Sequence, residues 1–295
     1  MFGVTRQAHY QHNWYQECLS TEHHLIIKEV KQIRQFHRCM GTRKLYEKIQ
    51  DFLLEHNIKM GRGALFDLLA SNGLLVRKRR RTISTTMSYH RYHKWPNLIN
   101  GFVPSGINQL YVSDITYWKI KTGYIYISLI TDAYSHKIVG YNVADNLETM
   151  ESRKALELAL HGFGGRASQL IHHSDRGLQY CSSEYVKLLQ QHGIRISMTE
   201  TSEPTDNAIA ERVNGILKNE YLLNYEVDSL DEAKKLLDQT IRLYNKERPH
   251  MSVGMLTPEI VHEHNLKTEK VWKTYPWKKR NIVNPLQDEL KTVNL

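Results

Sequence analysis

The order of the secondary-structure signals after residue 108 constrains the fold of this chain most. Three runs with alternating apolar residues follow one another at 109–120, 124–131 and 137–143. Alternation over such lengths predicts β-strands. Residues 121–123, Lys-Thr-Gly, separate the first two runs and predict a hairpin turn. The sequence therefore predicts three consecutive strands that pair in an antiparallel arrangement.

After residue 143 the signals alternate between helix and strand. Helices are predicted at 147–160, 182–192, 205–221 and 230–245, and strands at 168–174 and 194–198. Strands interleaved with helices form a sheet that has helices packed on it. The whole pattern predicts an α/β fold with a mixed sheet flanked by helices.

Three carboxylates stand out against this pattern. Asp114 interrupts an apolar strand, Asp175 ends another apolar run just before Gly177, and Glu211 lies in a predicted helix. A buried charge is costly unless it is paired or binds a metal. Thirty-five residues lie between Asp175 and Glu211. Carboxylate oxygens on separate elements are the ligands that Mg²⁺ uses in phosphoryl chemistry.

Each of these acids also has an ordinary explanation. Asp114 is equally expected on a half-exposed strand, where it would face water. Asp175 is compatible with an Asx-turn, in which the side chain accepts a hydrogen bond from a nearby backbone amide. Glu211 shares a polar helix face with Asn214 and Lys218, and such a face is typical of any surface helix. The spacing alone does not choose between these alternatives.

The positive charge of the chain lies in its first third. Residues 1–100 contain 17 Lys and Arg against 7 Asp and Glu, a net charge of +10, whereas the whole chain carries +9. The remaining residues are therefore close to neutral, at −1. A basic segment joined to a near-neutral domain indicates DNA binding in the first part and chemistry in the second.

Residues 1–82 have helical patterns. An amphipathic helix is predicted at 20–40, a second helix begins after Gly41 with Thr42 as its cap, and a third covers 62–71 before Asn72 and Gly73. Short helices around a glycine-containing turn are typical of a helix-turn-helix, although an ordinary helical hairpin fits equally well.

A basic run follows the third predicted helix. It consists of Arg77, Lys78, Arg79, Arg80 and Arg81. Such a run is usually a solvated tail, but its position here favours contact with DNA phosphates. Residues 83–107 are polar, contain prolines and lack periodicity, so they are predicted to form a linker.

Other classes of protein are disfavoured by the sequence. The three cysteines are scattered and form no CxxC pair, which excludes a zinc knuckle and a disulfide framework and fits a reducing, cytosolic setting. No apolar run reaches the 18 or so residues of a membrane span, so no membrane partner is expected.

Several ordered stretches carry a family resemblance. They are SDITYW, HHSDRGLQYCSSEY, SMTETSEPTDNAIAERVNGILKNEY and YNKERPHMSVGMLTPEIV. They resemble the catalytic domain of the IS-three family of insertion-sequence transposases, within the DDE transposase and retroviral integrase group. Upstream, GTRKLYEKI and GRGALFDLLASNGLLVRKRRRTISTT resemble the helix-turn-helix segment of that family. The resemblance covers roughly residues 40–265.

This resemblance implies a domain organisation. It comprises an N-terminal helical segment at 1–40, a helix-turn-helix-like DNA-binding region with the basic run at 41–82, a linker at 83–107, an RNase H-like integrase catalytic core at 108–265 and a basic C-terminal tail at 266–295. The name of the core fold comes from the resemblance, whereas its strand and helix order comes from the sequence itself.

The resemblance also implies the chemistry. Asp114, Asp175 and Glu211 would be the catalytic residues and would hold two Mg²⁺ ions, for which Mn²⁺ can substitute. DNA cleavage and strand transfer would both be in-line displacements at phosphorus, without a covalent protein intermediate.

Further residues are given supporting roles by the family pattern. Lys218 and Arg248 would contact DNA, although Arg248 could equally have a structural role. His173 and Asn207 would support the acidic residues; for His173 a packed polar role is the alternative, and Asn207 occupies a position where a helix cap is needed.

The expected partners also follow from the resemblance. They are double-stranded DNA (element ends and target), further copies of the chain on that DNA, and an upstream-frame polypeptide with a helix-turn-helix and a leucine zipper, fused by frameshifting. This chain has no heptad run of its own. The expected location is the bacterial cytoplasm, in association with the nucleoid. Two other functions remain open: a DNA-binding regulator without catalysis, and a plain RNase H-like nuclease.

Overall fold

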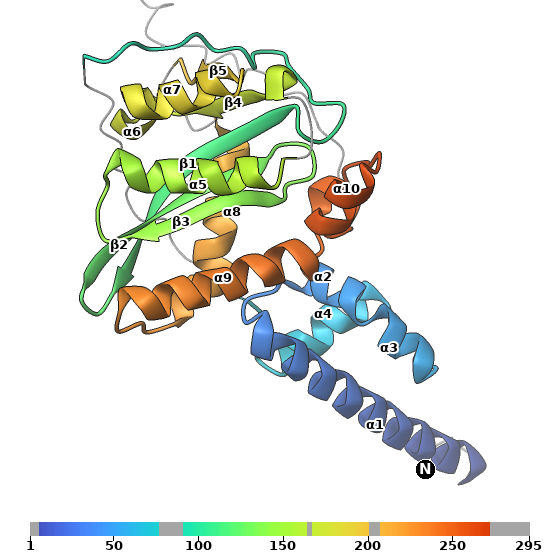
Figure 1. Ribbon diagram of the computed structural model, residues 1–295. Coiled ribbons are helices and arrows are strands. Elements are labelled where there is room, and N and C mark those ends of the chain that lie inside the picture. Colours follow the sequence, from blue (N-terminus) through green and yellow to red (C-terminus); the bar gives the residue numbers. More distant parts are fainter. Residues whose placement is uncertain (1–5, 77–90, 164–166, 201–206, 272–295) are drawn as a thin grey trace, which may run out of the picture.

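The computed structural model describes residues 6–76, 91–163, 167–200 and 207–271. An α-helical unit at the N-terminal end lies beneath an α/β core in Figure 1. The basic run at 77–81 and the first two residues of the helix predicted over 205–221 lie outside the described residues. None of the helices within the described ranges is long and apolar enough to cross a membrane.

The helical unit is built around one hydrophobic cluster. Its helices are α1 (Arg6–Phe36), α2 (Thr42–Lys48), α3 (Gln50–Glu55) and α4 (Arg62–Ser71). Ile26 and Val30 of α1 are buried against Leu45 of α2 and Leu65 and Leu69 of α4. The last part of α1 therefore belongs to the same folded unit as the helices that follow it.

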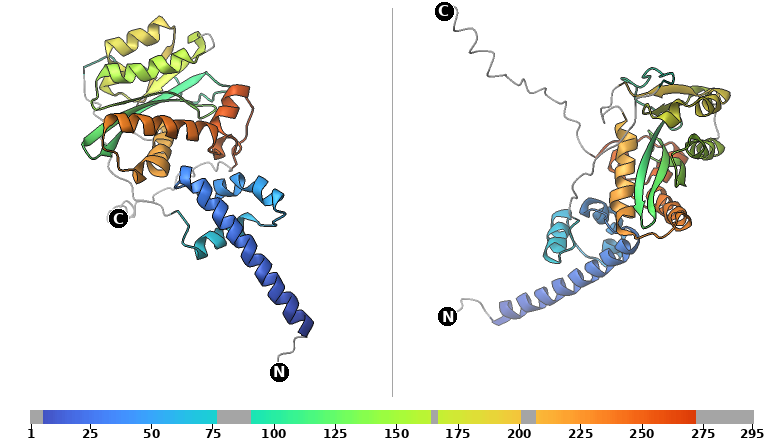
Figure 2. Two further views of the ribbon diagram at one scale, coloured as in Figure 1. Left: turned by 60° about the horizontal axis from the view of Figure 1, so that its bottom comes forward. Right: turned by 90° about the vertical axis from the view of Figure 1, so that its left-hand side faces the viewer.

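Several predictions about this unit are corrected. Helix α1 begins at Arg6, well before residue 20, and Figure 2 shows its first part extending away from the rest of the molecule. That part lacks the apolar periodicity that packing produces. Gly41, not Thr42, is the N-cap of α2. The predicted second helix is two short helices that meet at Ile49. Helix α4 matches its predicted bounds.

The core contains a five-stranded mixed sheet. Its strands are β1 (Leu110–Ile120), β2 (Gly123–Asp132), β3 (Ile138–Ala144), β4 (Ile171–Ser174) and β5 (Arg195–Met198), in the order β3-β2-β1-β4-β5. The first three strands pair antiparallel, whereas β4 pairs parallel with β1 and β5 parallel with β4. The predicted α/β class is confirmed, and this strand order is that of the RNase H-like fold.

Helices cover both faces of this sheet. The α-helices are α5 (Thr149–His161), α6 (Leu178–Cys181), α7 (Ser183–Gln191), α8 (Ala208–Ile216), α9 (Leu230–Lys246) and α10 (Pro258–His264). A π-helical turn, η2 (Leu217–Tyr221), follows α8. Three short 3₁₀ turns are η1 (Ala167–Gln169), η3 (Leu222–Asn224) and η4 (Met251–Val253). Figure 1 shows α5 in front of the sheet and α8 behind it. The predicted long helix over 205–221 is thus divided into α8 and η2.

Alternation along β1 and β2 decides which residues meet which helices. Tyr111 and Ile130 pack with α5 and α7, whereas Val112 packs with Ala210 of α8. Because side chains alternate along a strand, Asp114 lies on the same face as Val112 and points toward α8. Helix α5 can approach β3 closely because residue 140 is glycine: a Cβ there would overlap the Ala155 carbonyl oxygen.

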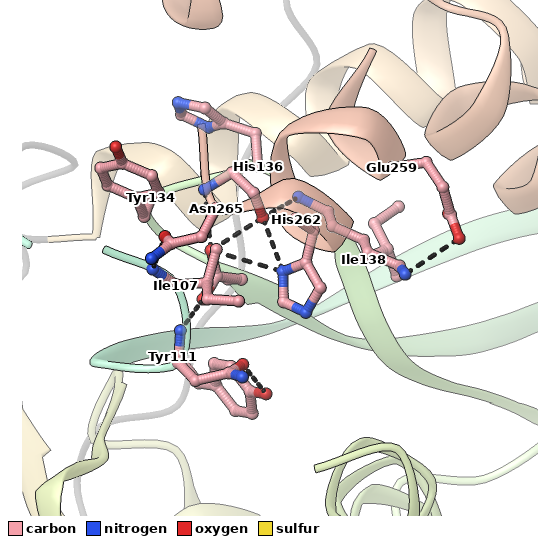
Figure 3. A network of polar contacts seen from close by, with 12 residues as sticks. Ile107, Tyr111, Tyr134, His136, Ile138, Glu259, His262 and Asn265 are labelled. Carbon is pink, nitrogen blue, oxygen red and sulfur yellow. Dashed lines mark hydrogen bonds and ion pairs between the residues drawn. The ribbon is translucent and has the colours of Figure 1, made fainter. Parts of the chain in front are cut away.

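A polar network attaches α10 to the sheet, as Figure 3 shows. The Asp132 carboxylate accepts hydrogen bonds from the Ser135 hydroxyl at 2.8 Å and from the Asn108 amide at 2.8 Å. Ser135 Oγ lies 3.0 Å from His262 Nδ1 of α10. Lys137 Nζ donates to Glu259 Oε1 at 3.0 Å. Helix α10 was not among the predicted elements, and these contacts explain its position.

A buried ion cluster joins the helical unit to the core. Arg248 is only 1% exposed, and its Nε and Nη2 donate to the two carboxylate oxygens of Glu220, each at 2.8 Å. Lys44 of α2 donates to Glu220 Oε1 at 2.9 Å. Burial opposes ionisation of Glu220, but hydrogen bonds and charge from Arg248 outweigh it and lower the pKa of Glu220 to about 2. We call these three residues the Glu220 cluster.

The Glu220 cluster gives a prediction about stability. Arg248→Ala should lower the free energy of unfolding by about 3–5 kcal/mol, because Glu220 would remain buried without its main partner. The double variant Arg248→Met/Glu220→Leu should recover part of this loss. Urea unfolding followed by circular dichroism measures both changes. Equal stability of wild type and Arg248→Ala would show that the ion pair is not needed.

Candidate active site

Asp114 lies in the middle of β1 and is held from α8. The side-chain amide of Asn214 donates to Asp114 Oδ2 at 2.6 Å. Asn214 is 5% exposed, so this hydrogen bond is shielded from water. The sequence analysis placed Asn214 with Glu211 on a polar helix face typical of the surface. That placement of Asn214 is wrong, because Asn214 is buried and faces the sheet.

The start of α8 is fixed to the same strand. Asn207 is the N-cap residue, yet its side chain caps no backbone amide of the helix. Its amide instead donates to the carbonyl oxygen of Ser113 at 2.9 Å, one residue before Asp114. The first-turn amide of Glu211 donates to the Asn207 carbonyl oxygen at 3.1 Å. Asn207 therefore ties the helix that carries Glu211 to the strand that carries Asp114.

Asp175 follows β4 at the level of Asp114. The parallel register pairs Val112 with His173. Continuing that register by two residues places Asp175 beside Asp114. Asp175 Oδ1 accepts a hydrogen bond from the Gly177 amide at 2.9 Å, so the alternative Asx-turn is also present. A Cβ on Gly177 would lie 2.9 Å from the same oxygen, which explains the glycine.

The three carboxylates influence one another. Burial is the largest cause that raises the pKa of Asp114 to about 7, followed by the negative charge of Asp175, while Glu211 adds a smaller effect in the same direction. The hydrogen bond from Asn214 acts the other way. Asp114, Asp175 and Glu211 thus share one region of negative potential.

These acids do not form a closed ligand set. Among the residues that the structure describes, no three His, Cys, Asp or Glu side chains converge closely enough to hold a metal ion. The donor types nevertheless fit a hard cation, because carboxylates carry the charge and amide oxygens lie nearby. The Oδ1 atoms of Asn207 and Asn214 are buried and accept no hydrogen bond from any described residue. A divalent cation would offset the repulsion among the carboxylates.

Lys218 lies on η2, just beyond α8. Its Nζ is 4.0 Å from the centroid of the Tyr117 ring, a cation–π contact. Burial lowers the pKa of Lys218, and the charge of Asp114 opposes this effect, so the lysine lies within the field of the acidic residues. Its predicted DNA contact remains a prediction.

Two histidines of β4 have structural partners. His173 Nδ1 lies 2.8 Å from Ser197 Oγ of β5. Its predicted support of Asp175 remains a prediction. His172 was not singled out from the sequence, yet its Nε2 lies 2.7 Å from Ser113 Oγ and 3.0 Å from the Tyr185 hydroxyl. This contact links β4 and α7 to β1 beside Asp114.

Arg248 has the structural role that was the alternative to a DNA contact. Its guanidinium is buried in the Glu220 cluster and cannot meet a phosphate at the surface. The five cations Arg77, Lys78, Arg79, Arg80 and Arg81 lie outside the described residues. Asn214 is the site residue that the sequence analysis missed; its position three residues after Glu211 was the available signal.

Comparisons with known proteins agree on one family. Residues 104–204 and residues 192–258 each match the Integrase core domain family. The insertion element IS600 31 kDa protein of Shigella sonnei is 34% identical over 267 residues, covering 89% of this chain and 96% of the relative. Transposase InsF for insertion sequence IS3A of Escherichia coli is 30% identical over 200 residues, covering 67% of this chain and 69% of the relative.

Solved structures show a weaker similarity. The HTLV-2 integrase catalytic core domain in complex with magnesium has a TM-score of 0.43 at 20% identity, covering 52% of this chain and 96% of that chain. An intasome of simian T-cell lymphotropic virus in complex with PP2A regulatory subunit B56 gamma has a TM-score of 0.46 at 17% identity, covering 84% of this chain and 78% of that chain.

The raised pKa of Asp114 gives a prediction for the metal-free protein. An unfolded aspartate has a pKa of about 3.9, so the folded state holds this proton more tightly. The contribution of Asp114 to stability is then lost as pH rises from about 4 through about 7. Between about pH 4 and about pH 7 the wild type should lose unfolding free energy relative to Asp114→Asn, whose side chain does not ionise. Urea unfolding of both proteins in EDTA measures this difference.

Mg²⁺ provides the complementary measurement. It should raise the melting temperature of wild type more at pH 8 than at pH 5, because the ion competes with protons for the same carboxylates. Asp114→Asn should lose most of this pH dependence. Equal stabilisation of wild type by Mg²⁺ at both pH values would contradict a cation site at Asp114.

Proposed function

The chain belongs to the IS-three family of insertion-sequence transposases, and we propose that Asp114, Asp175 and Glu211 form its catalytic, metal-binding site. The family assignment makes the chain a DDE transposase, an enzyme of phosphoryl transfer on DNA. The proposal is supported by the negative charge of Asp175, which acts on Asp114, and by the parallel pairing of Val112 with His173 two residues before these acids. Asn207 also ties the helix of Glu211 to the strand of Asp114.

Divalent cations are the cofactor of this enzyme class. We propose that two Mg²⁺ ions, replaceable by Mn²⁺, would be held by Asp114 together with Asp175 and by Asp114 together with Glu211. Bound there, they would supply Lewis-acid chemistry for activating water or a DNA 3′-hydroxyl group and for stabilising the leaving oxygen. Asn214 holds Asp114 Oδ2 through its amide and so orients the other oxygen of the same carboxylate.

Other residues position the DNA in this proposal. Lys218 lies near Asp114 and offers its ammonium to a phosphate beside the acids. The basic run at 77–81 adds phosphate contacts that are independent of sequence. The domain division at residues 40, 82, 107 and 265 belongs to the same proposal, with DNA binding before the linker and chemistry after it.

Assembly completes the proposed function. Joining two element ends to a target requires that the ends be paired, so we propose that several copies act together on DNA. The upstream-frame polypeptide, joined by frameshifting, would supply a leucine zipper. The chain would act in the bacterial cytoplasm, at the nucleoid.

The two other candidate functions predict different products. A regulator that only binds DNA gains nothing from a carboxylate partly buried beside two others, because acidic groups repel DNA. A plain nuclease would leave cut ends only. A transposase also gives joined strands, so an assay with labelled element ends and supercoiled target separates the three.

Asp175→Asn should abolish Mg²⁺-dependent cleavage and joining and leave DNA affinity unchanged or slightly higher, because one negative charge is removed. The control Asp145→Asn removes the same charge from an exposed residue after β3 and should keep full activity. Strand transfer and fluorescence anisotropy measure the two properties. Wild-type strand transfer by Asp175→Asn would remove this residue from the site.

Lys218→Ala should lower strand transfer several-fold through weaker DNA binding, with the Mg²⁺ concentration for half-maximal activity unaltered. Lys218→Arg keeps the charge and should retain more activity. A Mg²⁺ titration at saturating DNA makes the comparison. A raised Mg²⁺ requirement in Lys218→Ala would instead place the lysine among the groups that organise the metal.

A further inference from the structure

A cavity of about 490 Å³ lies between the helical unit and the core. The helical unit contributes Arg43, Tyr46 and Glu47 of α2 and Arg62 of α4, and the core contributes Met251 and Met255. The two units that meet here are the ones to which DNA binding and chemistry are assigned above. We call this space the junction cavity.

The arginines of the junction cavity have no side-chain partner among the residues that the structure describes. Arg43 and Arg62 are exposed, and neither forms a hydrogen bond or ion pair with any residue in the described ranges. The neighbouring lysines differ: Lys44 is bound to Glu220, and Lys48 is bound to Glu247. Lys44 and Lys48 of α2 are therefore paired with acids of the core, whereas Arg43 and Arg62 are paired with no acid in the described ranges.

The remaining walls favour an anion with several oxygens. Tyr46 donates its hydroxyl to the Met60 carbonyl oxygen at 3.2 Å, so its ring forms a wall of the cavity. Met251 and Met255 are apolar and reduce hydration on the core side. Arg43 and Arg62 line the same cavity, and planar guanidinium groups match the oxygens of a phosphate. Glu47 is the one acid among the lining residues.

We propose that the junction cavity binds a backbone phosphate of the DNA on which the transposase acts. This inference rests on the proposed function, because it takes DNA as the ligand. The core side is a fixed backbone: the Met255 amide donates to the His250 carbonyl oxygen, and the Val271 amide donates to that of Met251, each at 3.1 Å. A phosphate held there contacts both units and couples DNA binding to their relative position.

The test is the salt dependence of DNA binding. Fluorescence anisotropy with a 25-base-pair fluorescein-labelled duplex of arbitrary sequence gives the affinity of the full chain at several NaCl concentrations. Arg43→Gln/Arg62→Gln should weaken binding about tenfold. A plot of the logarithm of the binding constant against the logarithm of the NaCl concentration has a slope, called here the salt slope, that reflects the number of neutralised phosphates. The double variant should reduce the magnitude of this slope by roughly 0.9 for each phosphate that is no longer neutralised. Both arginines are exposed and form no ion pair with a described residue, so thermal melting should show an unchanged fold.

A matched double variant controls for net charge. Lys187→Gln/Arg195→Gln also removes two positive charges, from α7 and from the first residue of β5, at the far end of the core. Its salt slope should equal that of wild type. Arg43→Lys/Arg62→Lys keeps the charges without the bidentate geometry and should retain most of the slope with a smaller loss of affinity.

The core wall provides an independent test. Met251→Glu places a carboxylate in the cavity without changing either arginine, and Met251→Gln is its neutral match in size. The glutamate variant should bind DNA more weakly than the glutamine variant, with a lower salt slope. Equal binding of the two variants would show that no phosphate lies against the core side of the cavity, which contradicts the proposal.

Two results would contradict phosphate binding in the junction cavity without affecting the proposed catalytic site. One is a wild-type salt slope in Arg43→Gln/Arg62→Gln. The other is an equal reduction of the slope in the Lys187→Gln/Arg195→Gln control, which would indicate a general charge effect. Strand transfer by wild type with labelled element ends and supercoiled target shows in either case whether the proposed function holds.

Discussion

The partly buried carboxylate of Asp114 is the constraint on which the rest of the core depends. A charge in the middle of a sheet strand is unfavourable unless other groups offset the loss of hydration. Asn214 supplies a hydrogen bond from α8, and Asn207 fixes the start of that helix to Ser113 beside the acid. The position of α8 against the sheet, and with it the position of Glu211, follows from these two amides.

The same helical segment reaches the helical unit at its other end. After α8 the chain continues through the π-helical turn η2, which carries Lys218 and Glu220. Glu220 is held by Arg248 of the core and Lys44 of α2. One continuous segment therefore connects the acidic site with the junction between the units, and π-helical turns are frequent at functional sites.

The sequence predicted the elements whose signals are local. Alternation located β1, β2 and β3 to within one or two residues, and apolar periodicity located α4 and α9. It also singled out the three acids, Asp114 on β1, Asp175 just after β4 and Glu211 on α8. Partners that depend on tertiary packing were not predictable in the same way. Asn214 was predicted to lie on a polar helix surface, and Arg248 was equally compatible with DNA binding, until the fold placed each opposite a buried carboxylate.

The most direct measurement of the central claim locates the metal itself. In the presence of Fe²⁺, ascorbate and peroxide, hydroxyl radicals form at the bound ion and cleave the nearby backbone, and mass spectrometry identifies the positions. The account predicts cleavage close to residues 114, 175 and 211, suppressed by excess Mg²⁺ and absent in Asp114→Asn. Cleavage confined to other parts of the chain, such as the histidines near α10, would contradict it.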